Sequence, residues 1–206
     1  MRLIARSALM GGIALSLVAG GVIAQSAFTQ NPAEVRAGNY TLDSAHGKIT
    51  YKINHLGFST YIGQFAGVEA NLTLDPANPS ASTLTATVPV AGHDNTSEGL
   101  KTHLQSADFF DAAQFPTISF VATSITVDSD DPTEADVVGN LTIKDVTRPV
   151  TLEVKFNQAG EQRGQYRVGF DGETTIKRSD FGMTYGLPAI GDEVELHIEG
   201  EFVAAQ

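Results

Sequence analysis

The 206-residue chain contains no cysteine and no tryptophan. Without cysteine it has no disulfide, no thiolate nucleophile, no cysteine zinc site and no thioether attachment of haem. A lipoprotein anchor is excluded as well, because that anchor is attached to a cysteine at the cleavage site. The lack of tryptophan makes the aromatic girdle of an outer-membrane barrel hard to build.

Catalytic signatures are also missing. The sequence has no Gly-x-Ser-x-Gly elbow, no His-Glu-x-x-His helix, no phosphate loop and no dinucleotide fingerprint. The triplet Asp180-Phe181-Gly182 matches the magnesium triplet of kinases, but no glycine-rich loop or catalytic loop accompanies it. We therefore expect a protein that binds something, and not an enzyme.

Basic residues are scarce, with 13 Lys and Arg against 24 Asp and Glu. Two of the basic residues, Arg2 and Arg6, precede an uncharged run from Ala8 to Ala24 that ends in Val22-Ile23-Ala24. This pattern predicts a signal peptide over residues 1–24, cleaved after Ala24. An uncleaved membrane anchor is the alternative. The mature chain then has a net charge of −13, which disfavours nucleic acid and anionic lipid headgroups as partners.

Residues 25–38 are small and polar and predict a flexible arm, followed by one domain over residues 39–206. In that domain apolar and polar residues alternate, which is typical of strands with one buried face. Val150, Leu152, Val154 and Phe156 are the clearest example. The predicted strands cover residues 48–55, 65–75, 82–91, 117–127, 136–144, 150–156, 164–177 and 194–202.

One short helical segment is predicted near residues 97–113. Ser97 is a suitable N-cap, Glu98 favours the first turn, and Leu100 and Leu104 share a face. Pro116 ends the segment before the next strand.

The predicted fold class is all-β, an eight-stranded antiparallel barrel. Closure buries the apolar faces and removes exposed edges. Eight strands leave an interior that either fills with side chains or holds one small ligand. A two-sheet sandwich fits the same alternation. An outer-membrane barrel would place the acidic residues of the last strand, such as Glu193 and Glu195, in a narrow lumen at high cost.

Several polar residues have two interpretations. His93 and His103 could contribute to a metal site, or could be capping and surface histidines. Asp108 and Asp111 could form an acid–base pair, or could cap turns around Phe109-Phe110. Arg178 and Asp180 could pair across a turn beside Phe181 and Met183.

A set of ordered motifs covers nearly all of the mature chain. The motifs are Leu42-Asp43-Ser44-Ala45-His46, His55-Leu56-Gly57-Phe58-Ser59, Gly63-Gln64-Phe65, the run 103–111 (HLQSADFFD), the run 115–120 (FPTISF), Gly139-Asn140-Leu141-Thr142-Ile143, the run 146–152 (VTRPVTL), Gly169-Phe170 and the run 178–183 (RSDFGM). In their order and spacing they resemble the YceI-like family of exported, lipocalin-like proteins that bind polyisoprenoids.

The resemblance implies a lipocalin-like barrel, a periplasmic location, often a homodimer, and an isoprenoid or similar lipid inside. The ligand would be a polyisoprenoid or isoprenoid quinone, with no further cofactor, no metal and no stable membrane insertion. Leu100-Lys101 and the segment 158–164 depart from the family pattern, which leaves head-group and dimer contacts open.

From the alternation we expect thirteen apolar residues to line the chamber: Tyr51, Ile53, Phe58, Phe65, Leu72, Phe109, Phe110, Ile118, Phe120, Leu141, Phe170, Phe181 and Met183. The expected polar rim consists of His103, Asp108, Arg178 and Asp180. Two alternatives stay open. One is an enzyme that acts on a lipid head group through Asp108, His103 or Asp180. The other is a structural or stress-response barrel with a packed interior.

Overall fold

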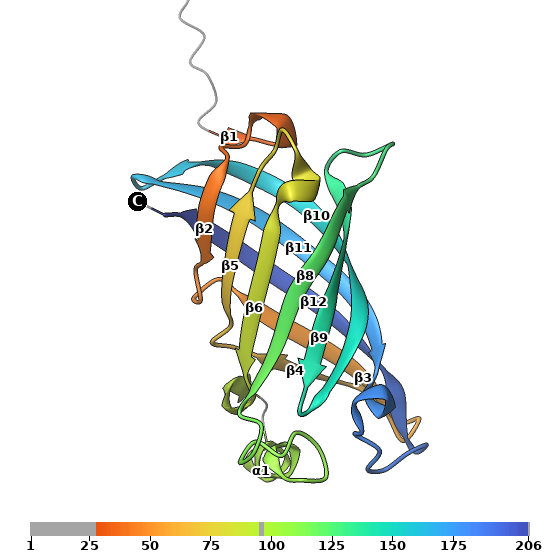
Figure 1. Cartoon of the computed structure of the whole chain (residues 1–206). Coiled ribbons are helices and arrows are strands. Elements are labelled where there is room, and N and C mark those ends of the chain that lie inside the picture. Colours follow the sequence, from red (N-terminus) through yellow and green to blue (C-terminus); the bar gives the residue numbers. More distant parts are fainter. Residues whose placement is uncertain (1–27, 95–96, 206) are drawn as a thin grey trace, which may run out of the picture.

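A closed ring of antiparallel strands forms the body of the protein, as the computed structural model shows for residues 28–94 and 97–205 (Figure 1). Within these residues eight strands make up the ring, and the hydrogen bonding runs from the first strand to the last and back to the first. In ring order they are β2 (Gly38–Leu42), β5 (Glu69–Leu74), β6 (Thr83–Pro89), β8 (Thr117–Val127), β9 (Glu134–Ile143), β10 (Val146–Gln162), β11 (Gln165–Lys177) and β12 (Ile190–Ala204). The predicted antiparallel barrel is confirmed, and the two-sheet sandwich is wrong.

Four further strands extend the wall. The first half of β12 pairs with β3 (Lys48–His55), which pairs with β4 (Ser59–Phe65). β7 (His93–Asp94) adds a short piece beside β4, and β1 (Phe28–Thr29) pairs with β10 at the opposite end. Strand β12 therefore pairs with β2 at one end and with β3 at the other.

The predicted strands are largely found, but their membership in the ring differs. The strand predicted over 65–75 covers the last residue of β4 and all of β5, because residues 66–68 between them belong to no strand. Strands β2 and β4 were not predicted. β2 is five residues long and has one buried side chain, Tyr40, so its alternation is weak. The predicted strand 48–55 lies outside the closed ring, in the extension.

The segment predicted as a flexible arm, residues 25–38, is described from Phe28 onward. Here Asn31 caps a short 3-10 helix (Pro32–Glu34) by accepting a hydrogen bond from the backbone of Ala33. Val35 is buried in the core, and Arg36 pairs with Glu161 at 2.6 Å. The predicted signal peptide and its cleavage site lie outside the described residues.

The predicted helical segment is helix α1 (Glu98–Gln105) with irregular turns after it. Ser97 accepts a hydrogen bond from the Leu100 backbone at 3.3 Å, as expected of an N-cap. The helix lies at one end of the barrel, beside the loop that joins β11 to β12 (Figure 1). No helix within residues 28–94 and 97–205 combines the length and apolar character needed to cross a bilayer.

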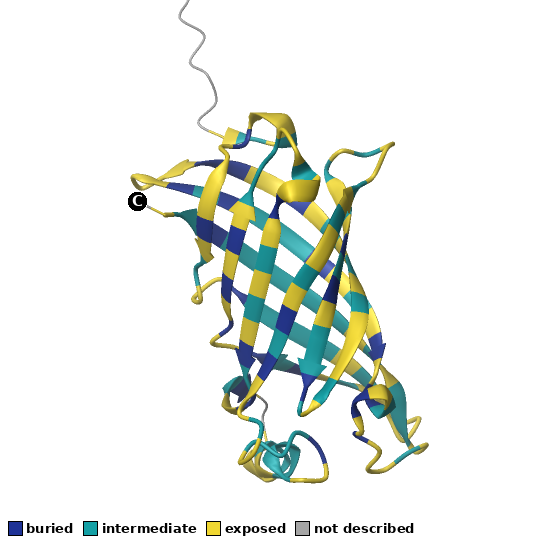
Figure 2. Cartoon of the chain, viewed as in Figure 1, coloured by how far each residue is buried: buried dark blue, intermediate teal, exposed yellow. Residues whose placement is uncertain are grey.

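The apolar sides of the strands face the barrel interior, and the charged sides face outward. On β12, for example, Leu196 and Ile198 point inward, while Glu195 pairs with Lys52 on the outside. The alternating bands of buried and exposed residues follow each strand in Figure 2. An outer-membrane arrangement, with a polar lumen and an apolar outer face, is therefore the reverse of what the structure shows.

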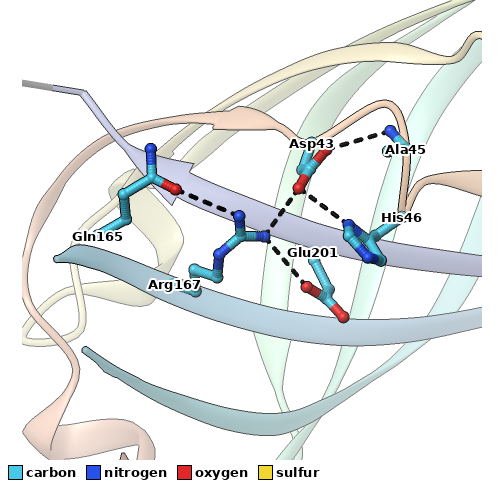
Figure 3. Close-up of polar contacts among 6 residues, drawn as sticks. All are labelled: Asp43, Ala45, His46, Gln165, Arg167 and Glu201. Atoms are coloured by element: carbon cyan, nitrogen blue, oxygen red, sulfur yellow. Dashed lines mark hydrogen bonds and ion pairs between the residues drawn. The ribbon is translucent and has the colours of Figure 1, made fainter. Parts of the chain in front are cut away.

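An ion-pair cluster on the outer face joins three parts of the chain near one end of the barrel (Figure 3). Arg167 of β11 donates to Asp43 at 2.8 Å and to Glu201 of β12 at 3.2 Å. Asp43 also accepts from the backbone of Ala45 and lies 2.9 Å from His46. Arg167 first, and then His46 and Ala45, lower the pKa of Asp43 to about 2.

We predict that Asp43→Asn weakens the fold at neutral pH and removes part of its acid sensitivity. The pKa of Asp43 is lower in the folded protein than its ordinary value of 3.8, so ionised Asp43 stabilises the fold above pH 3.8. That contribution is lost as the pH falls from 3.8 toward 2. Because the site is partly solvated, we expect a loss of about 1 kcal/mol at pH 7. Urea unfolding across this pH range measures it, with the exposed Asp145→Asn as control; equal acid sensitivity in both variants would refute the assignment.

Candidate functional site

A long cavity runs through the barrel and has a volume of about 810 Å³. At one end it begins against the 3-10 helix at Pro32, and at the other it reaches α1 and the loop between β11 and β12. Between these ends, the inward side chains of the barrel strands form its wall. Most of these residues are aliphatic or aromatic, and although Lys48, Asp171 and Glu199 also border the cavity, its surface is predominantly apolar, so the cavity suits an apolar molecule.

The cavity exists because side chains pack closely at the two ends of the barrel and leave its middle open. One packed cluster surrounds Tyr40, Val168 and Phe202, and the other surrounds Val90 and Phe181. Both clusters consist of buried hydrophobic residues in the part of the chain that the structure describes. Among the inward residues that belong to neither cluster are Leu152, Val154, Gly172, Thr174 and Ile198, together with Phe120 and Val137.

Along each of the strands β10, β11 and β12, inward residues of the two packed clusters are separated by inward residues that border the open middle. On β10, Val150 packs on the second cluster and Phe156 belongs to the first, with Leu152 and Val154 between them. On β11 the residues at middle height are small, Gly172 and Thr174, and they leave space that a larger side chain would fill. A barrel interior filled with its own side chains, one of the sequence-based alternatives, is therefore not observed.

Eleven of the thirteen predicted lining residues lie at the cavity wall. Glycines help to seat two of the aromatic rings: Tyr51 lies across Gly63 and Phe120 lies across Gly139, where any side chain would collide with the ring. The eleven residues are Tyr51, Ile53, Phe65, Leu72, Phe109, Phe110, Ile118, Phe120, Leu141, Phe170 and Met183. Contact with a ligand stays a prediction for each of them.

Two predicted lining residues lie elsewhere. Phe58 is 89% exposed at the tip of the β3–β4 hairpin, because the chain turns there and strand alternation no longer sets the direction of the side chain. Phe181 is fully buried, but it packs into the core under a short 3-10 helix (Arg178–Phe181) and does not face the cavity.

Helix α1 and the turns after it cover the mouth at the β3 end. Leu100, His103, Leu104 and Phe109 contribute to the cavity wall there. The His103 ring meets the rings of Phe109 and Tyr185 at centroid distances of 5.0 and 4.8 Å. This aromatic cluster joins α1 to the β11–β12 loop.

His103 and Asp108 do form a pair, with 3.1 Å between His103 Nε2 and Asp108 Oδ2. Of the two, His103 lines the cavity, whereas Asp108 is exposed and faces away from it. Asp111 adopts a positive φ of 47° and accepts from Gln114, so it acts in a turn. Of the two interpretations of Asp108 and Asp111, the placement of Asp111 therefore supports a role in a turn and does not support an acid–base pair.

Arg178 lies at the same mouth and is 4% exposed. It was expected to pair with Asp180. Instead, its guanidinium donates at 2.7–3.0 Å to four backbone carbonyls, those of Met183 and Tyr185 in the β11–β12 loop and those of Ile190 and Gly191 at the start of β12. Burial lowers the pKa of Arg178, with Asp192 opposing this effect. Arg178 thus shapes the loop that borders the mouth, while Asp180 is exposed on the outer face.

The main polar feature that the sequence did not predict is a buried pair of Tyr51 and His93. Tyr51 Oη lies 2.5 Å from His93 Nε2, and His93 is 1% exposed, with the Phe65 ring at 5.1 Å from its own. Burial lowers the pKa of His93 and raises that of Tyr51. Nothing in the spacing of the two residues, 42 apart in sequence, signals this contact.

We predict that His93 makes the fold less stable in mild acid. Its folded-state pKa lies below the ordinary 6.5, so the unfolded chain takes up a proton more readily than the folded protein. The free energy of unfolding should be fully retained above pH 6.5 and should fall as the pH drops below it. His93→Gln should make this decline shallower, while His197→Gln, on the exposed face of β12, should leave it unchanged. Identical pH profiles in thermal unfolding for the wild type and His93→Gln would contradict the prediction.

Metal binding has no visible site in the part of the chain that the structure describes. There, no three His, Cys, Asp or Glu side chains come together in a way that could hold an ion. His93 and His103, the candidates from the sequence, have Tyr51 and Asp108 as their neighbours.

Comparison with known proteins gives consistent matches. The family model described as the YceI-like domain matches residues 40–202. The protein YceI of Salmonella arizonae is 36% identical over 185 residues, which is 89% of this chain and 95% of the relative.

Two solved structures extend the comparison. BcnA of Burkholderia cenocepacia superimposes with a TM-score of 0.66 at 27% identity, covering 80% of this chain and 99% of BcnA. A polyisoprenoid-binding domain from Saccharophagus degradans superimposes with a TM-score of 0.63 at 10% identity, covering 82% and 100%, and this likeness shows the shared fold. With a family match that spans the whole barrel and a relative of this identity, the chain belongs to the YceI-like family.

Proposed function

We propose that this protein binds one long-chain isoprenoid or similar amphiphilic lipid inside the barrel and carries or stores it. The observation that supports this most strongly is the cavity of about 810 Å³ with an almost entirely apolar wall. Its volume lies within the range of about 300–1,000 Å³ that is typical of small-molecule sites. The structural likeness to a polyisoprenoid-binding domain favours a prenyl chain as the ligand.

The affinity would come from transferring the apolar chain out of water. Each buried methylene contributes about 0.8 kcal/mol, so a chain of several isoprene units binds well even after losing conformational freedom. The elongated shape of the cavity matches an extended chain. His103 at the α1 mouth and Tyr51, whose hydroxyl contacts His93, are polar groups of the cavity wall that a head group would meet.

The proposed periplasmic location is based on the predicted signal peptide. A signal peptide over residues 1–24 would export the chain to the periplasm, where a soluble carrier could shield a prenyl chain from water. A net charge of −13 for the mature chain suits solubility in such a compartment.

The experiment is mass spectrometry of an organic extract of the protein, purified from a bacterial host without detergent. We expect a prenyl-chain lipid near one molecule per protein. An extract without lipid, from protein that is folded by circular dichroism and does not take up an added isoprenoid quinone, would contradict the proposal.

A lipid-modifying enzyme is the second candidate, because His103 and Asp108 form a pair at the mouth. It makes a different prediction. Turnover of a prenyl substrate that is lost in Asp108→Ala, in protein that still binds lipid, would support the enzyme. We expect lipid binding to be unchanged in Asp108→Ala and no turnover in either protein.

A further inference from the structure

Exposed apolar side chains gather on two loops at the α1 end of the barrel. Leu56 and Phe58 lie at the tip of the β3–β4 hairpin, Ile62 lies on β4, and Tyr185 lies on the β11–β12 loop. They are four of the six large hydrophobic residues that are exposed in the described chain. We call these four residues the mouth collar. Both loops lie at the lower right of Figures 1 and 2, at the same end as α1.

The two loops are also free of charged side chains. Residues 53–63 and 181–191 contain no Asp, Glu, Lys or Arg, in a chain of which 18% is charged. The net charge of the whole chain is −11. An apolar, uncharged surface on a strongly acidic protein is the expected contact for a partner that is itself apolar and uncharged.

The loops are held together as one surface. The Leu56 backbone N–H donates to the Ala189 carbonyl at 3.0 Å, and Ile190 pairs with His55 across the sheet. Arg178 fixes the β11–β12 loop from beneath through its four carbonyl contacts. The mouth collar is therefore preorganised and does not need to fold before it meets a partner.

The backbone conformation and the exposure of Leu56 are both unfavourable for a leucine. It has a φ of 58°, in the left-handed region that favours glycine and asparagine, and its side chain is 47% exposed. This conformation is strained for a non-glycine residue, and leucine gains little burial here in return. A strained, exposed leucine beside an exposed phenylalanine points to a contact outside the chain.

The mouth collar is continuous with the cavity. Tyr185 is both exposed and part of the cavity wall, and its ring contacts His103 and Phe109 of the α1 cover. On the hairpin, Ile53 and Tyr61 line the cavity on the inner side of the strands that carry Leu56 and Phe58. An apolar chain that leaves the cavity here would stay in contact with apolar side chains as far as the collar.

We propose that the mouth collar docks transiently on the surface of an electrically neutral lipid bilayer, so that the cavity opens toward the membrane when lipid enters or leaves. This inference rests on the proposed lipid-binding function. Leu56 and Phe58 enter the interfacial region of the bilayer, as apolar residues of peripheral proteins do. The acidic remainder of the protein keeps the contact shallow and disfavours anionic membranes.

The absence of tryptophan makes docking directly measurable. Phe58→Trp places a single indole at the hairpin tip, and Val121→Trp places one on the outer face of β8, where Val121 is 47% exposed and away from the mouth. With phosphatidylcholine vesicles we expect a blue shift of emission and quenching by brominated lipid for Phe58→Trp, and no change for Val121→Trp. Replacing half of the lipid with phosphatidylglycerol should weaken the effect at low salt.

A second variant tests the role in lipid transfer. Leu56→Asn/Phe58→Ser should fold at least as well as the wild type, because asparagine accepts a positive φ. We expect its vesicle binding, and the rate at which an isoprenoid quinone passes from vesicles to protein, to fall roughly tenfold or more, with the amount of lipid bound at equilibrium unchanged.

Three outcomes would overturn docking on a bilayer. These are equal responses of the two tryptophan variants to vesicles, a shift of Phe58→Trp that depends on protein concentration without vesicles (a second copy of the chain), and an unchanged transfer rate in Leu56→Asn/Phe58→Ser. If vesicles shift Phe58→Trp but no lipid is ever bound, docking is supported and the proposed lipid-binding function fails.

Discussion

Filling the middle of the barrel should abolish lipid binding without unfolding the protein. In Leu152→Trp/Thr174→Trp, two indoles occupy the open zone between the packed clusters of the core. If they displace the equivalent of four methylenes of the ligand, binding weakens by about 3 kcal/mol, or roughly 100-fold. Lipid per protein, measured by organic extraction, should fall below detection.

The matched control uses the neighbouring residues on the same two strands. Thr151 and Thr175 face outward and are exposed, so Thr151→Trp/Thr175→Trp adds the same side chains to the outside of the barrel. This control should bind as much lipid as the wild type. Urea unfolding should show similar stability for both variants, because the inner indoles enter open space and displace no packed side chain. Wild-type lipid content in Leu152→Trp/Thr174→Trp would show that the ligand does not occupy the cavity.

Arg178→Met should cost the fold about 3 kcal/mol of unfolding free energy. The substitution retains much of the side-chain length, but it removes the charged donors to the carbonyls of Met183, Tyr185, Ile190 and Gly191. Hydrogen bonds to charged groups contribute roughly 1.5–3 kcal/mol each, and part of this loss is recovered as water reaches the loop. Chemical denaturation measures the stability, and hydrogen exchange should show lost protection at residues 183–191.

Arg148→Met is the control for this experiment, since Arg148 is exposed and its guanidinium donates to the neighbouring Thr147 carbonyl at 3.3 Å. It should change stability by less than about 0.5 kcal/mol. If Arg178→Met matched Arg148→Met in stability and in hydrogen exchange, Arg178 would not be the residue that organises the mouth loop.

The sequence predicted the barrel well, because burial of one face imposes a two-residue period that is legible along long strands such as β8 and β10. The prediction failed for short strands in which the alternation of apolar and polar residues is weak. β2 carries one buried side chain, and β4 presents Ile62 outward. In both, pairing with distant strands, and not local pattern, determines the structure.

The lining residues follow the same rule. Positions in the middle of strands, such as Tyr51, Phe120 and Leu141, lie at the cavity wall because their direction follows from alternation, and their contact with a ligand stays a prediction. Phe58 lies in a turn and Phe181 in a short 3-10 helix, where backbone geometry decides the direction of the side chain. An ion pair between Arg178 and Asp180 was considered because the charged residues can be read from the sequence. The sequence does not reveal that four backbone carbonyls converge on the guanidinium.

The Tyr51–His93 contact could not have been predicted from one sequence. It joins β3 to a two-residue strand beside β4, and the register of both strands has to be known before the two side chains can be brought together. The open zone in the barrel was predictable only in outline. Gly172 and Thr174 make room for it, but the sequence does not say that they lie at the same height as Leu152 and Ile198.

The most direct test of the account is a crystal structure of the protein purified without detergent from cells that make isoprenoid lipids. We predict a continuous rod of density along the barrel axis, passing Leu152, Thr174 and Ile198 and ending near His103. A barrel in which those side chains have closed on one another, leaving no elongated space, would contradict the claim that the interior is kept open for an apolar chain.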